Sequence, residues 1–194
     1  MTFLAGDPLQ NLKNDPAQLA GRSDPDMKIA VGRLLRPHGV KGEIKFVPFF
    51  DGIPELIINT PVELVMEGGA APLFATPVNF RGSEKALIVK FSGFDNPEDA
   101  RALTNRVAQL ERRRMPDLPP GNYYYEEIIG LPVYDEEGVR IGSLKDFFPA
   151  GDKDVWAIET VSGGEILLPC LPETLLNVDL QRGAITVRLM ETIL

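Results

Sequence analysis

The residues best suited to chemistry gather in the segment 28–50, KIAVGRLLRPHGVKGEIKFVPFF. His38, the only histidine of the chain, stands between Arg36 and Lys41 on a turn that two glycines bracket. A histidine there could act as a general base, but no G-x-S-x-G nucleophile motif accompanies it. The GVKG spacing also lacks the GK[ST] of a nucleotide-binding P-loop. We therefore assign no catalytic residue and expect no enzyme activity.

The same segment is suited to binding a polyanion. Five side chains able to carry positive charge are expected on one hairpin: Arg33, Arg36, His38, Lys41 and Lys45. Long aliphatic stems that end in a positive charge suit phosphate groups. Gly39 and Gly42 are expected to supply the positive φ of the turn, and the alternative is that their backbone contacts phosphate directly. Ordinary solvated surface charge is the alternative for the cations.

The net charge of −8 is unevenly distributed along the chain. Residues 27–114 contain thirteen basic and ten acidic side chains, whereas residues 115–194 contain five basic and fourteen acidic ones. The first segment therefore carries +3 and the second −9, and residues 1–26 carry −2. Two such segments would be attracted to different surfaces, one polyanionic and one cationic. The alternative is that the charge serves solubility alone.

Short apolar runs separated by Gly, Pro and Asn begin at Lys28 and predict strands. Six are expected in the first half, at Ile29–Leu35, Glu43–Phe50, Val62–Met66, Leu73–Phe80, Ala86–Phe91 and Val107–Glu111. Asn96 can cap a helix that begins at Pro97 and ends near Thr104. Six strands in so short a segment indicate a small barrel.

The strand pattern resumes after the proline-rich stretch MPDLPPGN. Strands are expected at Tyr123–Ile129, Leu131–Tyr134, Val139–Phe148, Val155–Glu159, Glu165–Pro169 and Ala184–Met190. One helical turn is expected at Pro172–Leu176, with Leu175 and Leu176 closing the end of a barrel. The sequence thus predicts an all-β protein of two small barrels joined by a Pro-rich linker. Its expected parts are a flexible leader (1–26), a first domain (27–114), the linker (115–122) and a second domain (123–194).

Several classes of protein and site are disfavoured. No stretch approaches the roughly 20 apolar residues that span a membrane, and the start lacks a secretory pattern. The single Cys170 excludes a disulfide framework and a multi-thiolate metal site. Asp135, Glu136 and Glu137 are consecutive around a turn and would diverge, which favours a solvated turn over a metal site. We expect a cytoplasmic monomer with no cofactor, metal or membrane association.

Two motifs resemble the RimM family of bacterial ribosome maturation factors. VGRLLRPHGVKGEIKF at 31–46 is similar to the opening signature of that family, a strand, a Pro-His-Gly-x-x-Gly turn and a return strand. NYYYEEIIGLPVYDEEGVRIGSL at 122–144 is similar to the start of its PRC-barrel domain. Further matches are GDKDVWAI at 151–158, LLP at 167–169 and VDLQRGAITV at 178–187. The resemblance covers residues 28–194.

This resemblance implies a non-enzymatic factor that assists assembly of the head of the small ribosomal subunit. A translation-factor-like front barrel would bind rRNA through the five hairpin residues, in agreement with the charge distribution. The PRC-barrel would bind a basic ribosomal protein of the head, the one numbered nineteen, through Tyr123 and Tyr124. Tyr125 and Glu126 replace the family's aromatic-then-His continuation. The alternative is a PRC-barrel adaptor that binds a non-ribosomal partner.

The three consecutive tyrosines have a structural alternative to partner binding. On a strand, Tyr124 would lie on the face opposite Tyr123 and Tyr125, so at least one ring would face outward. Outward aromatic rings with a polar tip are typical of protein interfaces, whereas the alternative is packing against the linker prolines. Trp156 is expected in the barrel core.

Overall fold

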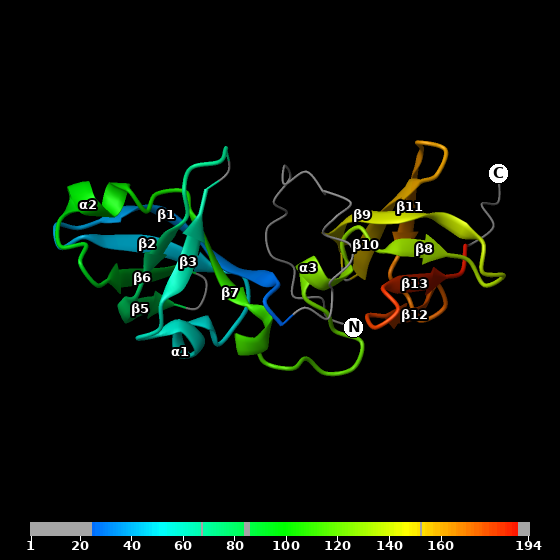
Figure 1. Ribbon diagram of the computed structural model, residues 1–194, viewed down its shortest axis with the longest axis horizontal. Helices are drawn as coiled ribbons and strands as arrows, with labels where there is room; N and C mark the ends of the chain where they lie inside the picture. Colours follow the sequence, from blue (N-terminus) through cyan, green and yellow to red (C-terminus); the bar gives the residue numbers. More distant parts are fainter. Residues whose placement is uncertain (1–24, 67, 84–85, 152, 190–194) are drawn as a thin grey trace. The chain divides into compact units, whose positions relative to one another are not determined.

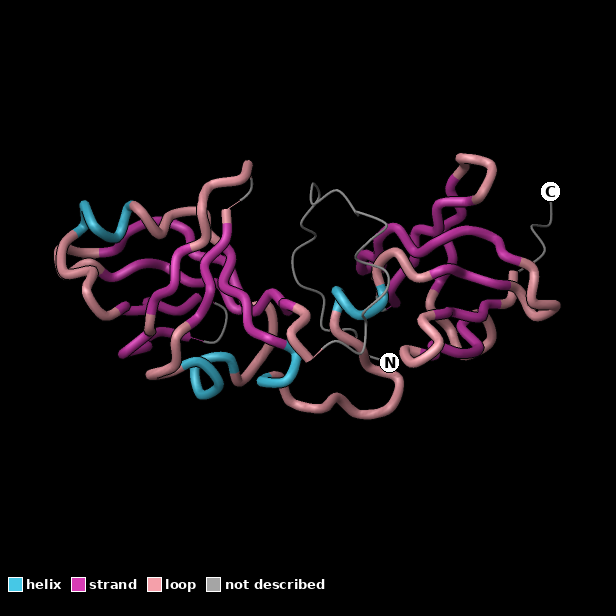
Figure 2. The backbone as a smooth tube through the Cα atoms, in the orientation of Figure 1, coloured by secondary structure: helices cyan, strands magenta, loops and turns pink. Residues whose placement is uncertain are grey.

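The computed structural model describes residues 25–66, 68–83, 86–151 and 153–189. Contacts divide these residues between two compact units, with the division in the chain between Asp117 and Leu118. We call residues 28–117 the front unit and residues 118–189 the rear unit. Both are built mainly of strands, with only short helices (Figures 1 and 2). The expected leader lies outside the described residues, apart from Pro25 and Asp26.

The front unit is a seven-stranded sheet in the order β4-β3-β7-β1-β2-β6-β5. Its strands are β1 (Lys28–His38), β2 (Glu43–Pro48), β3 (Val62–Val65), β4 (Leu73–Ala75), β5 (Pro77–Ser83), β6 (Ala86–Phe91) and β7 (Val107–Glu111). The expectation of six strands is wrong by one. The predicted strand at 73–80 is two strands, because the chain leaves β3 at Thr76 and pairs with β6 at the other edge of the sheet. The carbonyl of Thr76 accepts the Ser92 N–H at this corner, at 2.9 Å.

The front unit also contains short helices. Helix α2 (Pro97–Arg101) begins as predicted, since the Asn96 Oδ1 accepts the Asp99 N–H at 2.8 Å. It ends before Thr104, in a succession of tight turns. Helix α1 (Ile53–Ile57) was not predicted, although its two buried isoleucines are four residues apart, the spacing of one helix face. Arg112–Arg114 form a single 3₁₀ turn.

Strands β1, β2 and β6 contribute to the core of the front unit, together with β3, β7 and the short helices. Leu87, Val89 and Phe91 are buried and Lys90 is partly exposed on the other face, as the alternation in ALIVKF predicts. The ring of Phe46 packs over Gly32, where an added Cβ would lie 2.2 Å from its Cζ atom. A side chain at Gly32 would therefore displace one of the largest buried groups of this core.

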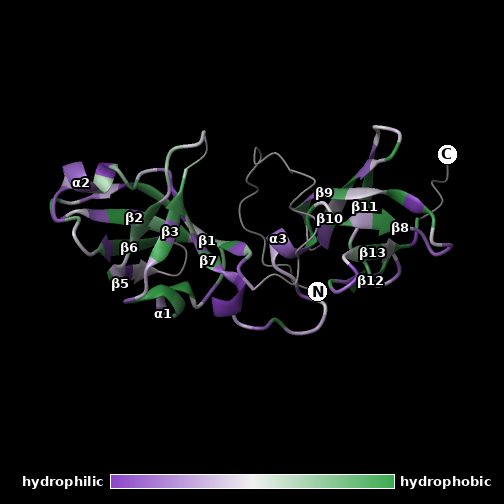
Figure 3. Ribbon diagram, viewed as in Figure 1, coloured by the Kyte–Doolittle hydropathy of each residue, from purple (hydrophilic) through white to green (hydrophobic). Residues whose placement is uncertain are grey.

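The rear unit is a six-stranded sheet in the order β11-β10-β9-β8-β13-β12. Its elements are α3 (Tyr125–Ile128), β8 (Pro132–Tyr134), β9 (Arg140–Ala150), β10 (Lys153–Thr160), β11 (Glu165–Pro169), β12 (Leu175–Asp179) and β13 (Ala184–Val187). β13 and β8 are parallel, and the other neighbours are antiparallel. Trp156 is fully buried in the core, as predicted. In both units the hydrophobic residues concentrate on the strands (Figure 3).

The predicted strand at Tyr123–Ile129 is wrong, because residues 125–128 form helix α3. Glu127 and Tyr124 close this turn reciprocally: the Glu127 carboxylate accepts the Tyr124 N–H, and the Glu127 N–H donates to the Tyr124 carbonyl, both at 3.0 Å. A glutamate three residues after the N-cap residue is a known signal for the start of a helix. The apolar run that suggested a strand instead buries Ile128 and Ile129 against the core.

The helical turn predicted at Pro172–Leu176 is only partly correct. A turn occupies residues 172–174, and Leu175 already begins strand β12, which was not predicted. Leu175 is buried, but Leu176 is exposed because side chains alternate along a strand. Leu176 therefore does not close the end of the barrel.

Helices of the described ranges are short. None of them has the length or the hydropathy to cross a membrane.

Candidate functional site

The β1–β2 hairpin holds the first candidate site. The strands pair antiparallel up to His38 and Glu43, and the turn between them uses Gly39 and Gly42 at φ values of 67° and 68°. Both glycines thus supply the positive φ that the sequence predicts. An added Cβ at Gly42 would lie only 2.0 Å from the Phe94 carbonyl oxygen, whereas at Gly39 the nearest atom would be 3.8 Å away. The hairpin tip therefore packs tightly on the segment before α2.

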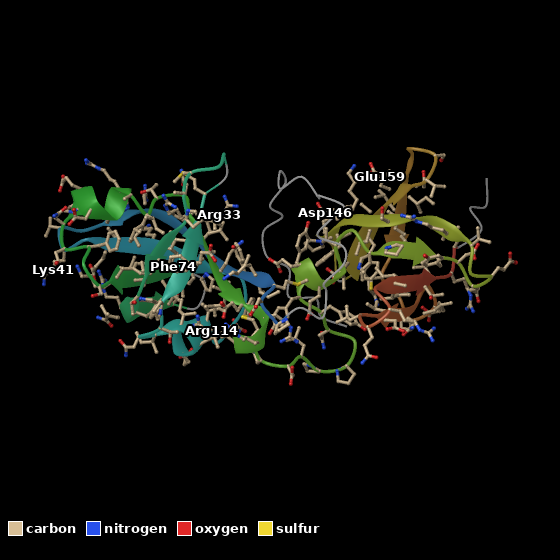
Figure 4. The ribbon with its side chains drawn as sticks, viewed as in Figure 1. Arg33, Lys41, Phe74, Arg114, Asp146 and Glu159 are labelled. Atoms are coloured by element: carbon tan, nitrogen blue, oxygen red, sulfur yellow. The ribbon has the colours of Figure 1, made fainter. Side chains whose placement is uncertain are left out.

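All five predicted cationic residues lie on this hairpin. Arg36 and Lys41 are exposed at its end, and His38 beside them is partly buried. Arg33 and Lys45 are partly buried on the strands, where alternation with the core residues places them on the outer face of the sheet. Figure 4 shows the Lys41 side chain at the free end of the hairpin. The structure thus places all five residues on two adjacent strands and their turn, with Arg36 and Lys41 the most exposed.

Glu43 is the only acidic residue in the segment 28–50, and a residue of another strand neutralises it. Arg81 on β5 donates from Nε and Nη2 to the two carboxylate oxygens of Glu43, at 3.0 and 2.8 Å. This bond lowers the pKa of Glu43, and the nearby charges of His38 and Lys41 lower it further. Among the described residues, Arg36, Lys41 and Lys45 have no carboxylate within ion-pair distance. Their charges remain available to an external anion.

The backbone of the turn is held by Lys90 on β6. Its Nζ donates to the Lys41 carbonyl at 2.7 Å, to the Phe94 carbonyl, and to the Asp95 carboxylate at 2.8 Å. Lys90 therefore ties the hairpin tip to the segment before α2, while the Lys41 side chain stays in solvent. A rigid backbone lowers the entropy cost of presenting these charges to a ligand.

The second candidate site is the start of the rear unit, around α3. Tyr124 is 1% exposed and belongs to the core, so the alternation expected for a strand does not hold. Tyr123 is partly buried, and burial followed by the nearby Cys170 and Glu127 raises its pKa. Tyr125 donates its hydroxyl to the Asp146 carboxylate at 3.2 Å, and burial raises its pKa strongly. Tyr123 and Tyr125 thus leave part of their side chains exposed to solvent, whereas Tyr124 exposes almost nothing that a partner could contact.

The acidic turn at Asp135–Gly138 is structural. The Asp135 Oδ1 accepts the N–H groups of Glu137 and Val139, at 3.0 and 2.8 Å. Glu136 forms a two-point ion pair with Arg188 on the exposed surface, at 2.6 and 2.8 Å. The Asp135 and Glu136 carboxylates thus have separate partners, and no group of three or more His, Cys, Asp or Glu side chains within the described ranges is placed to hold a metal ion.

Comparison with known proteins assigns each half of the chain. Residues 29–115 match the model of the RimM N-terminal domain, and residues 120–194 match the model of the PRC-barrel domain. These are the two halves in which the sequence motifs lie.

Curated relatives extend over nearly the whole length. The ribosome maturation factor RimM of Limosilactobacillus reuteri (strain DSM 20016) is 33% identical over 161 residues, which is 83% of this chain and 95% of that protein. The ribosome maturation factor RimM of Geotalea uraniireducens is 31% identical over 166 residues, 86% of this chain and 95% of that protein. The crystal structure of a RimM 16S ribosomal RNA processing protein from Pseudomonas aeruginosa covers 84% of this chain and 98% of its own, at 26% identity and a TM-score of 0.43.

Proposed function

Because the chain belongs to the RimM family of ribosome maturation factors, we propose that it assists assembly of the head of the small ribosomal subunit through two separate contacts. Residues 27–114 bind rRNA, residues 123–194 bind a basic ribosomal protein of the head, and residues 115–122 link the two modules. The head protein is the one numbered nineteen. The protein acts as a monomer in the cytoplasm and makes or breaks no covalent bond.

The observation that carries the RNA contact is the charge state of the β1–β2 hairpin. Arg36, Lys41 and Lys45 lack carboxylate partners among the described residues. The nearby Glu43 carboxylate is paired with Arg81 instead. Cations that approach phosphates release condensed counterions, which drives binding without base recognition. Because Arg33, Arg36, His38, Lys41 and Lys45 share one rigid hairpin, one short stretch of backbone phosphates can meet them together. The exposed Arg36 and Lys41 make the first contact.

The protein contact is supported by charge and by aromatic surface. Residues 115–194 carry −9, which complements a basic ribosomal protein. Tyr123 supplies the accessible part of the tyrosine pair, since Tyr124 is buried. Tyr124 serves this contact indirectly, by anchoring the start of α3 in the core. Partly buried tyrosines lose little entropy when a partner covers them.

Two modest contacts on one chain reinforce each other. Once one module is bound, the linker holds the other at a high effective concentration near its site, so neither contact has to be strong. Loss of either contact when the head matures would then release the factor. This arrangement suits a factor that binds immature particles and leaves finished ones.

Titration of the purified chain with RNA of the small-subunit head, repeated at several salt concentrations, tests the RNA contact. Affinity should fall steeply as salt rises, because phosphate contacts dominate. A PRC-barrel adaptor with no nucleic-acid role would retain no RNA even at low salt, and that result would refute the proposal.

A further inference from the structure

One face of the rear sheet exposes apolar side chains. Across β9, β10 and β11, Phe148 lies opposite Val155, and Val155 lies opposite Pro169. In the next row Ala157 lies opposite Leu167. Residues that pair directly share a face of the sheet, and the core residue Trp156 alternates with these two rows. Phe148 and Leu167 are 40% and 55% exposed, so this outer face is not covered by the core.

Strand β11 forms one edge of the rear sheet. It pairs with β10, and no described strand pairs with its other side. Proteins usually protect an edge strand with charges, prolines or bulges. Here Glu165 and Pro169 stand only at the ends of β11, and the residues between them are Ile166, Leu167 and Leu168. The middle of this strand thus presents open backbone groups next to an exposed apolar side chain.

Carboxylates flank the apolar face. Asp146 shares a row with Ala157 and Leu167, and Glu159 lies opposite Glu165. Lys145 lies 3.2 Å from Glu165 and offsets that charge. Among the described residues, Asp146 accepts hydrogen bonds from two neutral donors, the Tyr125 hydroxyl and the Phe147 N–H, and has no cationic partner.

Glu159 adds to this surface a carboxylate that is exposed and has no ion-pair partner among the described residues. Asp146 and Glu159 are labelled in Figure 4. Lys153 at the far end of β10 is the opposing charge on this side. The face therefore suits a partner segment that is apolar and basic.

The α3 site adjoins strands of the same sheet. Cys170 follows β11 directly, and its N–H donates to the Asp154 carbonyl at 2.8 Å. Tyr123 packs against the core cluster that includes Cys170. Tyr125 contacts β9 through the hydrogen bond from its hydroxyl to Asp146. Tyr123 and Tyr125 therefore border the strands that carry the exposed apolar residues.

We propose that β11 accepts an extended basic segment of the ribosomal protein as an added strand, with its apolar side chains on Phe148 and Leu167 and its cations beside Asp146 and Glu159. Main-chain hydrogen bonds to β11 give affinity in this mode of recognition, and alternate side chains give specificity. The inference rests on the proposed function, because it places the partner of the rear unit on a defined surface.

Binding of the purified head protein to the full chain tests the inference by isothermal titration calorimetry. The variant Phe148→Ser/Leu167→Ser should weaken binding roughly tenfold to a hundredfold, as expected for central apolar contacts. The control Val139→Ser/Val161→Ser removes two other exposed valines, on turns outside β11, and should bind like the wild type. Trp156 fluorescence confirms that each variant is folded. Amide exchange should show Ile166–Leu168 becoming protected in the complex.

The outcomes separate this inference from the proposed function. If the wild type does not bind the head protein, the proposed function fails. If the wild type binds but the Phe148 and Leu167 variant binds equally well, or the β11 amides stay unprotected, the docking surface is wrong and the proposed function stands. If the wild type forms dimers and the Phe148 and Leu167 variant does not, the face binds a second copy of the chain. That result would overturn the inference.

Discussion

Arg81 on β5 donates hydrogen bonds to both carboxylate oxygens of Glu43 on β2, across the intervening strand β6. This ion pair masks the only negative charge of the β1–β2 hairpin. In the proposed RNA contact, Arg81 acts without touching RNA, because an uncovered Glu43 carboxylate would repel the phosphates. Arg81 would therefore support the proposed binding surface indirectly.

Replacing the two partners separately should change RNA affinity in opposite directions. Arg81→Gln exposes the Glu43 carboxylate and should weaken binding about fivefold at low salt, whereas Glu43→Gln should strengthen it by a similar factor, the order set by one unit charge at contact distance in water. The double variant restores the charge balance and should bind nearly like the wild type. Fluorescence anisotropy with labelled RNA measures all four proteins. A double variant as weak as Arg81→Gln would instead make Arg81 a direct RNA ligand.

The same ion pair makes the stability of the front unit depend on pH, and the sign of that dependence follows from the pKa of Glu43. Arg81 lowers the pKa of Glu43 below its ordinary value of 4.5, so the folded state favours the ionised carboxylate. This contribution to stability is complete above the ordinary pKa and disappears as the pH falls through the lower folded value. The difference in melting temperature between the wild type and Glu43→Gln should therefore shrink as the pH falls below about 4.5. Calorimetry across that range measures it, and a difference that grows on acidification would contradict the assignment.

Gly42 and Gly39 form a matched pair, because their φ values are nearly equal but their surroundings differ. Gly39→Ala should cost about 1 kcal/mol through φ alone. Gly42→Ala meets the same strain and also the Phe94 carbonyl, so it should cost about 3 kcal/mol or more. Calorimetry on the intact chain, with amide exchange of β2, measures the effect in the front unit. Equal costs would mean that the tip does not pack on Phe94 as described.

Tyr123 and Tyr124 should separate binding from folding. Tyr124→Ala empties a core site and should destabilise the rear unit by about 3–5 kcal/mol, the range for large aromatic truncations. Tyr123→Ala should leave most of the stability and weaken capture of the head protein. Urea unfolding followed by Trp156 fluorescence reports the first effect, because this tryptophan lies in the rear core. If the Tyr123→Ala protein is folded and captures the head protein as well as the wild type does, Tyr123 is not part of the interface.

Local sequence signals predicted most of the strands because side-chain alternation and turn residues act over a few positions. The β6 alternation and the Asn96 cap are examples, and both are confirmed. Long-range geometry was not predictable in this way. The corner at Thr76 depends on pairing with β6 rather than on any local break, and β12 is a strand because β13 pairs with it.

The candidate sites show the same limit. The hairpin cations follow from local sequence, but the Arg81–Glu43 pair joins residues 38 positions apart and had no local signal. The tyrosines were assigned to a strand because apolar period alone does not separate a short strand from a short helix. Glu127, three residues after Tyr124, was the available sign of a helix start, and it determines which ring is buried.

Binding to immature small-subunit particles over a range of salt concentrations tests the central claim, that the hairpin cations hold rRNA. The wild type should bind at low salt, and Arg36→Gln/Lys41→Gln should bind more weakly, with a salt slope lower by about 2, one for each lost phosphate contact. Arg140→Gln/Arg182→Gln removes the same charge from exposed sites of the rear unit away from the β9–β11 face and should keep the wild-type slope. Equal slopes for the two double variants, or a wild type that ignores the particles, would contradict the account.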